Sequence, residues 1–93
     1  MSKILLVEDD IGIITPLERY IEQSGYSVVR CQDGNEALAL FQEEKPTLLI
    51  LDINLPGKNG IEICEEIRAI SDVPIIVLSA RESEDDKVLL LQL

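Results

Sequence analysis

The sequence contains no histidine and has few cysteines, and both shortages limit the chemistry open to the protein. Without histidine, the chain cannot form a histidine-ligated metal site or a Ser-His-Asp triad, and it cannot carry a phosphohistidine of its own. Its two cysteines, Cys31 and Cys64, form no CxxC pair, which argues against a zinc site and a disulfide framework. We therefore interpret both as small core residues of a protein in the reducing cytosol.

Positive charge is scarce as well. The chain has 8 Lys and Arg against 18 Asp and Glu, which gives a formal net charge of −10. Such a surface repels phosphate backbones and anionic membranes, so we expect no direct nucleic-acid binding by this chain and no membrane binding. The apolar run near the N-terminus, residues 4–7, is too short for a signal peptide or a membrane span, so a cytoplasmic location is expected.

What the sequence does have is enough apolar residues for one folded domain. Hydrophobic residues make up 46% of its 93 residues, and charged residues make up 28%. This composition is too apolar for a disordered polyelectrolyte, and the length rules out two independent cores. We therefore predict a single domain over residues 1–93.

Short apolar runs alternate with segments of helical periodicity. The runs are continuous, as expected of strands that are buried on both faces: residues 4–7, 28–31, 48–51 and 75–78. Between them, apolar residues recur at helical spacing around residues 17–21, 37–41 and 63–70. This alternation predicts an α/β fold with a parallel sheet.

The helix limits are less well determined by local signals. Thr15-Pro16 can cap a first helix, but a start at Ile11 is also possible and would place Pro16 inside that helix. Ser83, followed by acidic residues, predicts a fourth helix that continues through residues 88–93 to the end of the chain.

Oxygen-bearing side chains follow three of the apolar runs. Ligands of open parallel sheets bind outside the carboxyl ends of the strands, so these side chains should converge. They are Glu8, Asp9 and Asp10 after the first run, Asp52 and Asn54 after the third, and Ser79 after the fourth. A solvated loop acid or helix cap is the simpler interpretation of any single one. The three positions together favour a divalent cation, Mg²⁺ or alternatively Mn²⁺.

Three stretches resemble the receiver domain of bacterial two-component response regulators. They are residues 4–10, the D-x-x-L-P-x-x-x-G loop within residues 48–60, and the P-I-I-x-L-[ST]-A strand within residues 73–80. The resemblance implies a flavodoxin-like doubly wound sheet of strand order 2-1-3-4-5. It also implies a phosphoacceptor module rather than an enzyme, whose partners are a sensor histidine kinase and an effector domain outside this chain.

The resemblance also implies roles for individual residues. Asp52 would accept the phosphoryl group, and Asp9 and Asp52 would bind Mg²⁺ directly. Glu8 would help through a water molecule, and Asn54 would contribute its backbone carbonyl. Ser79 would donate a hydrogen bond to a phosphoryl oxygen. Asp10 is interpreted as a helix cap or a more distant acid.

The sequence departs from the family pattern at its C-terminal end. It stops before the fifth strand, the fifth helix and the lysine of that family, so we expect four βα units in the order 2-1-3-4. The fourth strand would then be an uncovered edge. Either these residues are a fragment of a longer regulator, or the chain self-associates through that edge and the fourth helix or exchanges elements between copies to cover it. The Asp86-Lys87-Val88 stretch resembles regulators of transcription that carry a winged-helix DNA-binding domain.

Two other functions compete with the signalling module. A truncated or engineered receiver fragment could serve as a folding or assembly scaffold without signalling output. A Mg²⁺-dependent phosphohydrolase would share the carboxylates, but no histidine or arginine is placed beside them as an acid or a clamp.

Overall fold

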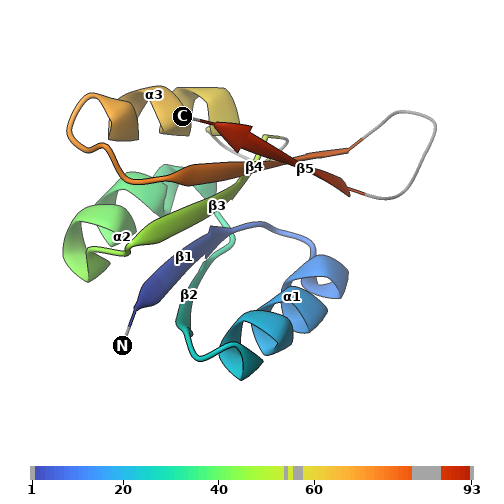
Figure 1. The fold of residues 1–93 in the computed structure, drawn as a ribbon. Helices are drawn as coiled ribbons and strands as arrows, with labels where there is room; N and C mark the ends of the chain where they lie inside the picture. The colour runs from blue at the N-terminus through green and yellow to red at the C-terminus, as the bar shows by residue number, and fades with distance from the viewer. Residues whose placement is uncertain (1, 54, 56–57, 81–86, 93) are drawn as a thin grey trace.

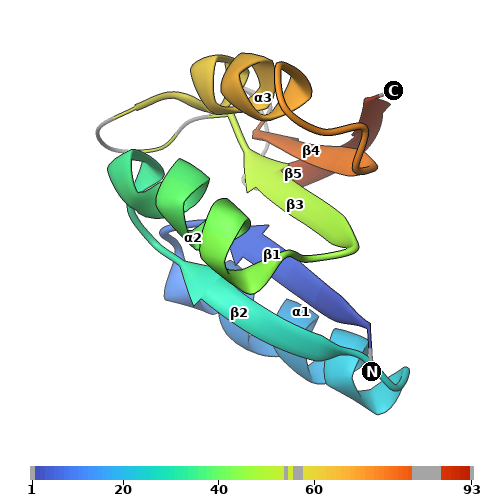
Figure 2. The same cartoon turned by 90° about the vertical axis from the view of Figure 1, so that its left-hand side faces the viewer.

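The structure is a computed structural model that describes residues 2–53, 55, 58–80 and 87–92. A central sheet carries helix α1 on one face and helices α2 and α3 on the other (Figures 1 and 2). The elements in chain order are β1 (Lys3–Val7), α1 (Ile11–Gln23), β2 (Ser27–Cys31), the 3-10 turn η1 (Gly34–Glu36), α2 (Ala37–Glu44), β3 (Leu48–Asp52), α3 (Gly60–Arg68), β4 (Ile75–Ala80) and β5 (Lys87–Gln92).

The sheet confirms the predicted doubly wound arrangement for its four parallel strands. Its order is β2-β1-β3-β4-β5, and β1 lies between β2 and β3. The register pairs Val7 with both Cys31 and Leu51, and it pairs Asp52 with Leu78. The carboxyl ends of β1, β3 and β4 therefore meet at one edge of the sheet.

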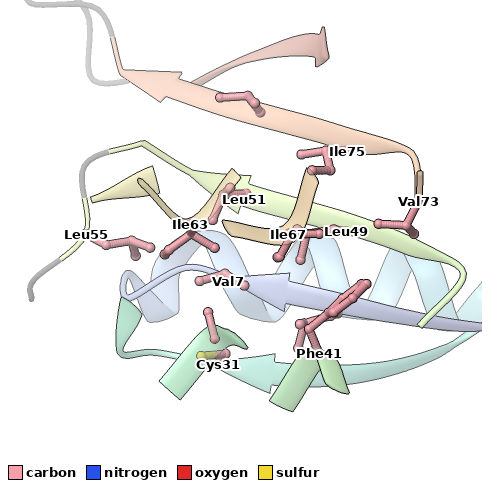
Figure 3. Close-up of a cluster of buried hydrophobic side chains, with 13 residues drawn as sticks. Val7, Cys31, Phe41, Leu49, Leu51, Leu55, Ile63, Ile67, Val73 and Ile75 are labelled. Atoms are coloured by element: carbon pink, nitrogen blue, oxygen red, sulfur yellow. The ribbon is translucent and has the colours of Figure 1, made fainter. Parts of the chain in front are cut away.

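Two apolar layers hold the helices against the sheet. Because successive strand residues point to opposite faces, Leu5 and Val7 pack under α2 and α3, whereas Ile4 and Leu6 pack against α1. Figure 3 shows the larger layer, where side chains from α2 and α3 meet those of β1, β3 and β4. This burial on both faces explains why the strands are short unbroken apolar runs.

Helix α1 begins at Ile11, so the start at Thr15 is wrong. The Asp10 side chain caps this helix by accepting a hydrogen bond from the Gly12 amide at 2.8 Å, as the cap interpretation of Asp10 predicts. Pro16 lies inside the helix and is exposed. The earlier start places Ile14 fully in the core, and this burial offsets part of the cost of the interior proline.

The predicted fourth helix is wrong over residues 87–92, which form strand β5. β5 pairs antiparallel with β4 along its whole length, from Ile75 opposite Gln92 to Ala80 opposite Lys87. Residues 83–86, where the helix was expected to begin, lie outside the described residues. The physical reason is the edge of β4, whose backbone N–H and C=O groups pair with those of β5 instead of with water or another chain.

This pairing corrects two further expectations. The sheet has a fifth strand, although it runs antiparallel, and β4 is not an uncovered edge. Self-association through the β4 edge and a fourth helix therefore has no structural basis.

In the part of the chain that the structure describes, no helix has the length and hydropathy needed to cross a membrane.

Candidate functional site

Three carboxylates converge at the carboxyl edge of the sheet. Glu8 and Asp9 directly follow β1, and Asp52 is the last residue of β3. Because Val7 and Leu51 are paired in register, Glu8 and Asp52 continue two adjacent strands side by side. One oxygen from each of Glu8, Asp9 and Asp52 lies within 4.8 Å of the others. The structure thus brings together three of the predicted site residues.

The burial of these acids differs sharply. Glu8 and Asp52 have no exposed surface, whereas Asp9 is exposed. Carboxylates that are close together and shielded from water repel one another, and a cation or hydrogen-bond donors must offset that repulsion. Both buried acids do take part in further interactions. An all-oxygen set with one solvent-facing member fits Mg²⁺, which prefers carboxylates and usually keeps several waters.

The backbone of the first acidic loop holds Glu8 in place. Its Oε2 atom accepts hydrogen bonds from the amides of Asp9 at 3.0 Å and Asp10 at 3.2 Å. The Glu8 amide donates to the Cys31 carbonyl at 2.9 Å, which continues the β1–β2 pairing by one residue. The Glu8 carboxylate is therefore fixed in direction before any ligand arrives.

The segment between Asp52 and α3 is held at its two ends by backbone contacts. The Gly60 amide donates to the Ile53 carbonyl at 2.9 Å. A Cβ atom at Gly60 would lie 2.5 Å from the Asp52 carbonyl oxygen and 2.6 Å from Ile53 Cα, so only glycine allows this approach. The Asn59 side chain caps α3 by accepting from the Glu62 amide at 2.9 Å. The start of α3 therefore lies directly against the backbone of Asp52.

The structure describes less of two predicted site residues, Asn54 and Ser79. Asn54 lies outside the described residues. Ser79 lies in β4, one residue beyond Leu78, which is the register partner of Asp52. The backbone of Ser79 therefore lies at the same end of the sheet as the acids.

The sequence analysis did not identify what the turn between β2 and α2 contacts. Cys31, interpreted as a core residue, is indeed buried, and burial raises the pKa of its thiol. Its Sγ donates to the Asp33 carbonyl at 3.1 Å, and the Asp33 side chain accepts from the Asn35 amide at 2.9 Å. Asp33 followed by Gly34 signals a turn, but nothing local shows that this turn contacts the acidic loops.

This geometry agrees with comparisons to known proteins. Residues 4–93 match the family of the response regulator receiver domain, and the chain belongs to that family. Receiver domains are the modules of two-component response regulators.

Three solved structures are similar to this chain. The BeF3-activated N-terminal receiver domain of RstA from Klebsiella pneumoniae has 36% sequence identity and a TM-score of 0.83, with 89% of this chain and 71% of that chain covered. CheY4, a chemotaxis response regulator of Vibrio cholerae, has 33% identity and a TM-score of 0.81, with 88% and 71% covered. The non-phosphorylated HemR receiver domain of Leptospira biflexa has 34% identity and a TM-score of 0.78, with 87% and 66% covered.

Proposed function

We propose that this chain is a phosphoacceptor that takes a phosphoryl group onto Asp52 from a phosphohistidine of a sensor histidine kinase. The observation that carries the proposal is the convergence of Glu8, Asp9 and Asp52, with their oxygens within 4.8 Å, in a chain of the receiver family. The chain has no histidine, so the donor must be another molecule. The chain would assist its own phosphorylation without being an enzyme for other substrates.

Four residues would take different parts in binding a divalent ion. Asp9 and Asp52 would hold Mg²⁺, with Mn²⁺ as the alternative, Glu8 would act through water, and Asn54 would offer its backbone carbonyl. When bound, the ion offsets the negative charge that builds up as the phosphoryl group meets a carboxylate. Asp9 is the exposed member, so an ion can reach it from solvent.

Asp52 would act as the nucleophile. An oxygen of its carboxylate would form the bond to phosphorus while the bond to the donor nitrogen breaks, and the leaving group stays on the partner. Pairing of β3 with β1 and β4 and the close contact with Gly60 fix the Asp52 backbone, so little motion is needed for attack. The Ser79 hydroxyl would donate a hydrogen bond to a phosphoryl oxygen.

The output of this step would reach the cell through an effector. We propose that the chain works in the cytoplasm and regulates transcription through an effector domain outside residues 1–93, of the winged-helix type. The formal charge of −10 argues against DNA contact by the receiver itself.

A phosphorylation assay tests the proposal. The chain is incubated with acetyl phosphate and Mg²⁺, and intact mass is compared with that of Asp52→Asn, which has nearly the same shape. We expect the mass of one phosphoryl group on the unsubstituted chain and none on the variant. Borohydride reduction and peptide mapping then locate the group, and a label on Asp9, Asp10 or Ser79 would refute the assignment.

A further inference from the structure

The turn between β2 and α2 contacts Glu8 on one side and Lys58, which lies between β3 and α3, on the other. We propose that this turn, residues 31–35, is a positioning element that fixes the Glu8 backbone relative to the Lys58 backbone and so tunes the ion site, and that Gly34 is its critical residue. The inference rests on the proposed function, because it assigns a role in the same ion site. None of the residues in the turn is a candidate ligand.

On one side, the turn is bonded to the Glu8 loop. The Cys31 carbonyl accepts the Glu8 amide at 2.9 Å. The turn is also rigid, because the Cys31 thiol donates to the Asp33 carbonyl at 3.1 Å and the Asn35 amide donates to Asp33 Oδ1 at 2.9 Å. With Cys31 only 2% exposed, a shift of the turn must move the Glu8 backbone or break the bond between them.

On the other side, the turn is packed against the loop that follows Asp52. Gly34 is buried, and a Cβ atom there would overlap the backbone carbonyl oxygen of Lys58 and lie 3.2 Å from Ile63 Cδ1. Gly34 is not among the glycines with positive φ, so its backbone conformation suits any residue. Lack of space alone therefore requires glycine here.

Two contacts link Lys58 and Gly60 to the rest of the fold. Lys58 Nζ pairs with Glu66 Oε2 on α3 at 2.7 Å, and the Gly60 amide is bonded to the Ile53 carbonyl. A methyl group at Gly34 must therefore displace the turn, the Lys58 backbone or both. Movement of the turn displaces the Glu8 backbone, which is bonded to Cys31, and ion binding by three carboxylates is sensitive to the position of each of them.

The first experiment compares two glycine variants. Gly34→Ala is set beside Gly25→Ala, where φ is +97° and nothing lies within 4 Å, so the control costs stability through backbone strain far from the acids. The dissociation constant for Mg²⁺ alone is measured by calorimetric titration. We expect Gly34→Ala to weaken binding about tenfold, as for groups that orient metal ligands. Gly25→Ala should leave the constant unchanged.

A second pair of variants works if Gly34→Ala fails to fold. Asp33→Asn and Asp33→Ala remove the same charge, but only asparagine keeps the cap on the Asn35 amide. We expect weaker Mg²⁺ binding in Asp33→Ala than in Asp33→Asn. Hydrogen exchange of the Glu8 amide, measured without Mg²⁺, should be faster in Asp33→Ala and unchanged in Asp33→Asn.

The outcomes separate this inference from the proposed function. Equal Mg²⁺ affinity in Gly34→Ala and the unsubstituted chain, or equal affinity and equal Glu8 exchange in the two Asp33 variants, would overturn the positioning role while phosphorylation of Asp52 stands. Failure of the unsubstituted chain to bind Mg²⁺ would overturn the proposed function and the positioning role together.

Discussion

The amino and carboxyl ends of the sheet differ in how their charged side chains are paired and buried. At the amino end, Lys3 of β1 pairs with Glu44 at the end of α2 at 2.8 Å, and both side chains are partly exposed. At the carboxyl end, Glu8 and Asp52 are fully buried beside Asp9. Solvated opposite charges contribute little to stability, whereas buried like charges reduce it. The comparison indicates that the carboxyl end of the sheet buries its acids at a cost in stability, as is common at functional sites.

The largest expected effect comes from glycines at the two ends. Gly60→Ala at the carboxyl end should destabilise the chain by about 3 kcal/mol, because its methyl group meets the Asp52 backbone. Gly25→Ala, toward the amino end of β2, should cost only about 1 kcal/mol of strain. Urea unfolding measures both. Equal losses would show that the contact at Gly60 is not tight.

The next effect concerns the exposed acid. Asp9→Ala should weaken Mg²⁺ binding at least about tenfold, because losing a ligand costs no less than losing groups that orient one. Asp10→Ala removes an equal charge and the α1 cap, so it should lower stability and leave Mg²⁺ affinity nearly unchanged. Calorimetric titration compares the two, and similar affinities would mean that only net charge attracts the ion.

The amino end should respond weakly to charge removal. Lys3→Gln and Glu44→Gln, measured singly and together, should give a coupling energy below about 1 kcal/mol, as for exposed ion pairs. Mg²⁺ affinity should not change in either variant. A larger coupling, read from a double-mutant cycle of urea unfolding, would remove the contrast between the two ends.

The smallest effect is a pH dependence at a surface pair. The hydrogen bond from Arg30 to Glu18 holds the pKa of the Glu18 carboxyl below its ordinary value. Because the folded pKa is lowered, the stabilisation is present above the ordinary glutamate pKa and is lost as pH falls through the folded value. It should be worth a few tenths of a kcal/mol. Unfolding of Glu18→Gln across acid pH should lack this contribution, and an unchanged pH profile would contradict it.

The acids at the carboxyl end of the sheet could be predicted from the sequence because the signals for them are local. Each buried strand is an unbroken apolar run, and the register of parallel strands places Glu8 beside Asp52. The start of α1 was ambiguous, since Asp10 and Thr15 are both acceptable caps and only the burial of Ile14 decides between them. A cap is a local feature, but burial depends on the whole fold.

Two features depended on contacts that no local pattern encodes. Residues 88–91 are a short apolar run that suits a helix or a strand, and the edge of β4 decides for a strand. The contact of Gly34 with the Lys58 carbonyl joins backbones that are distant in the sequence. Asp33 followed by Gly34 is a common turn pair, but no local signal could indicate which segment the turn contacts.

Unfolding with increasing Mg²⁺ tests most directly whether the buried acids form a cation site. Magnesium chloride is compared with sodium chloride at equal ionic strength, because the net charge of −10 makes any salt stabilising. At a hundredfold excess over its dissociation constant, Mg²⁺ should add about 2.7 kcal/mol to the unfolding free energy of the unsubstituted chain. In Asp52→Asn this gain should nearly vanish. Equal stabilisation of both chains, or none beyond that of sodium chloride, would contradict the account.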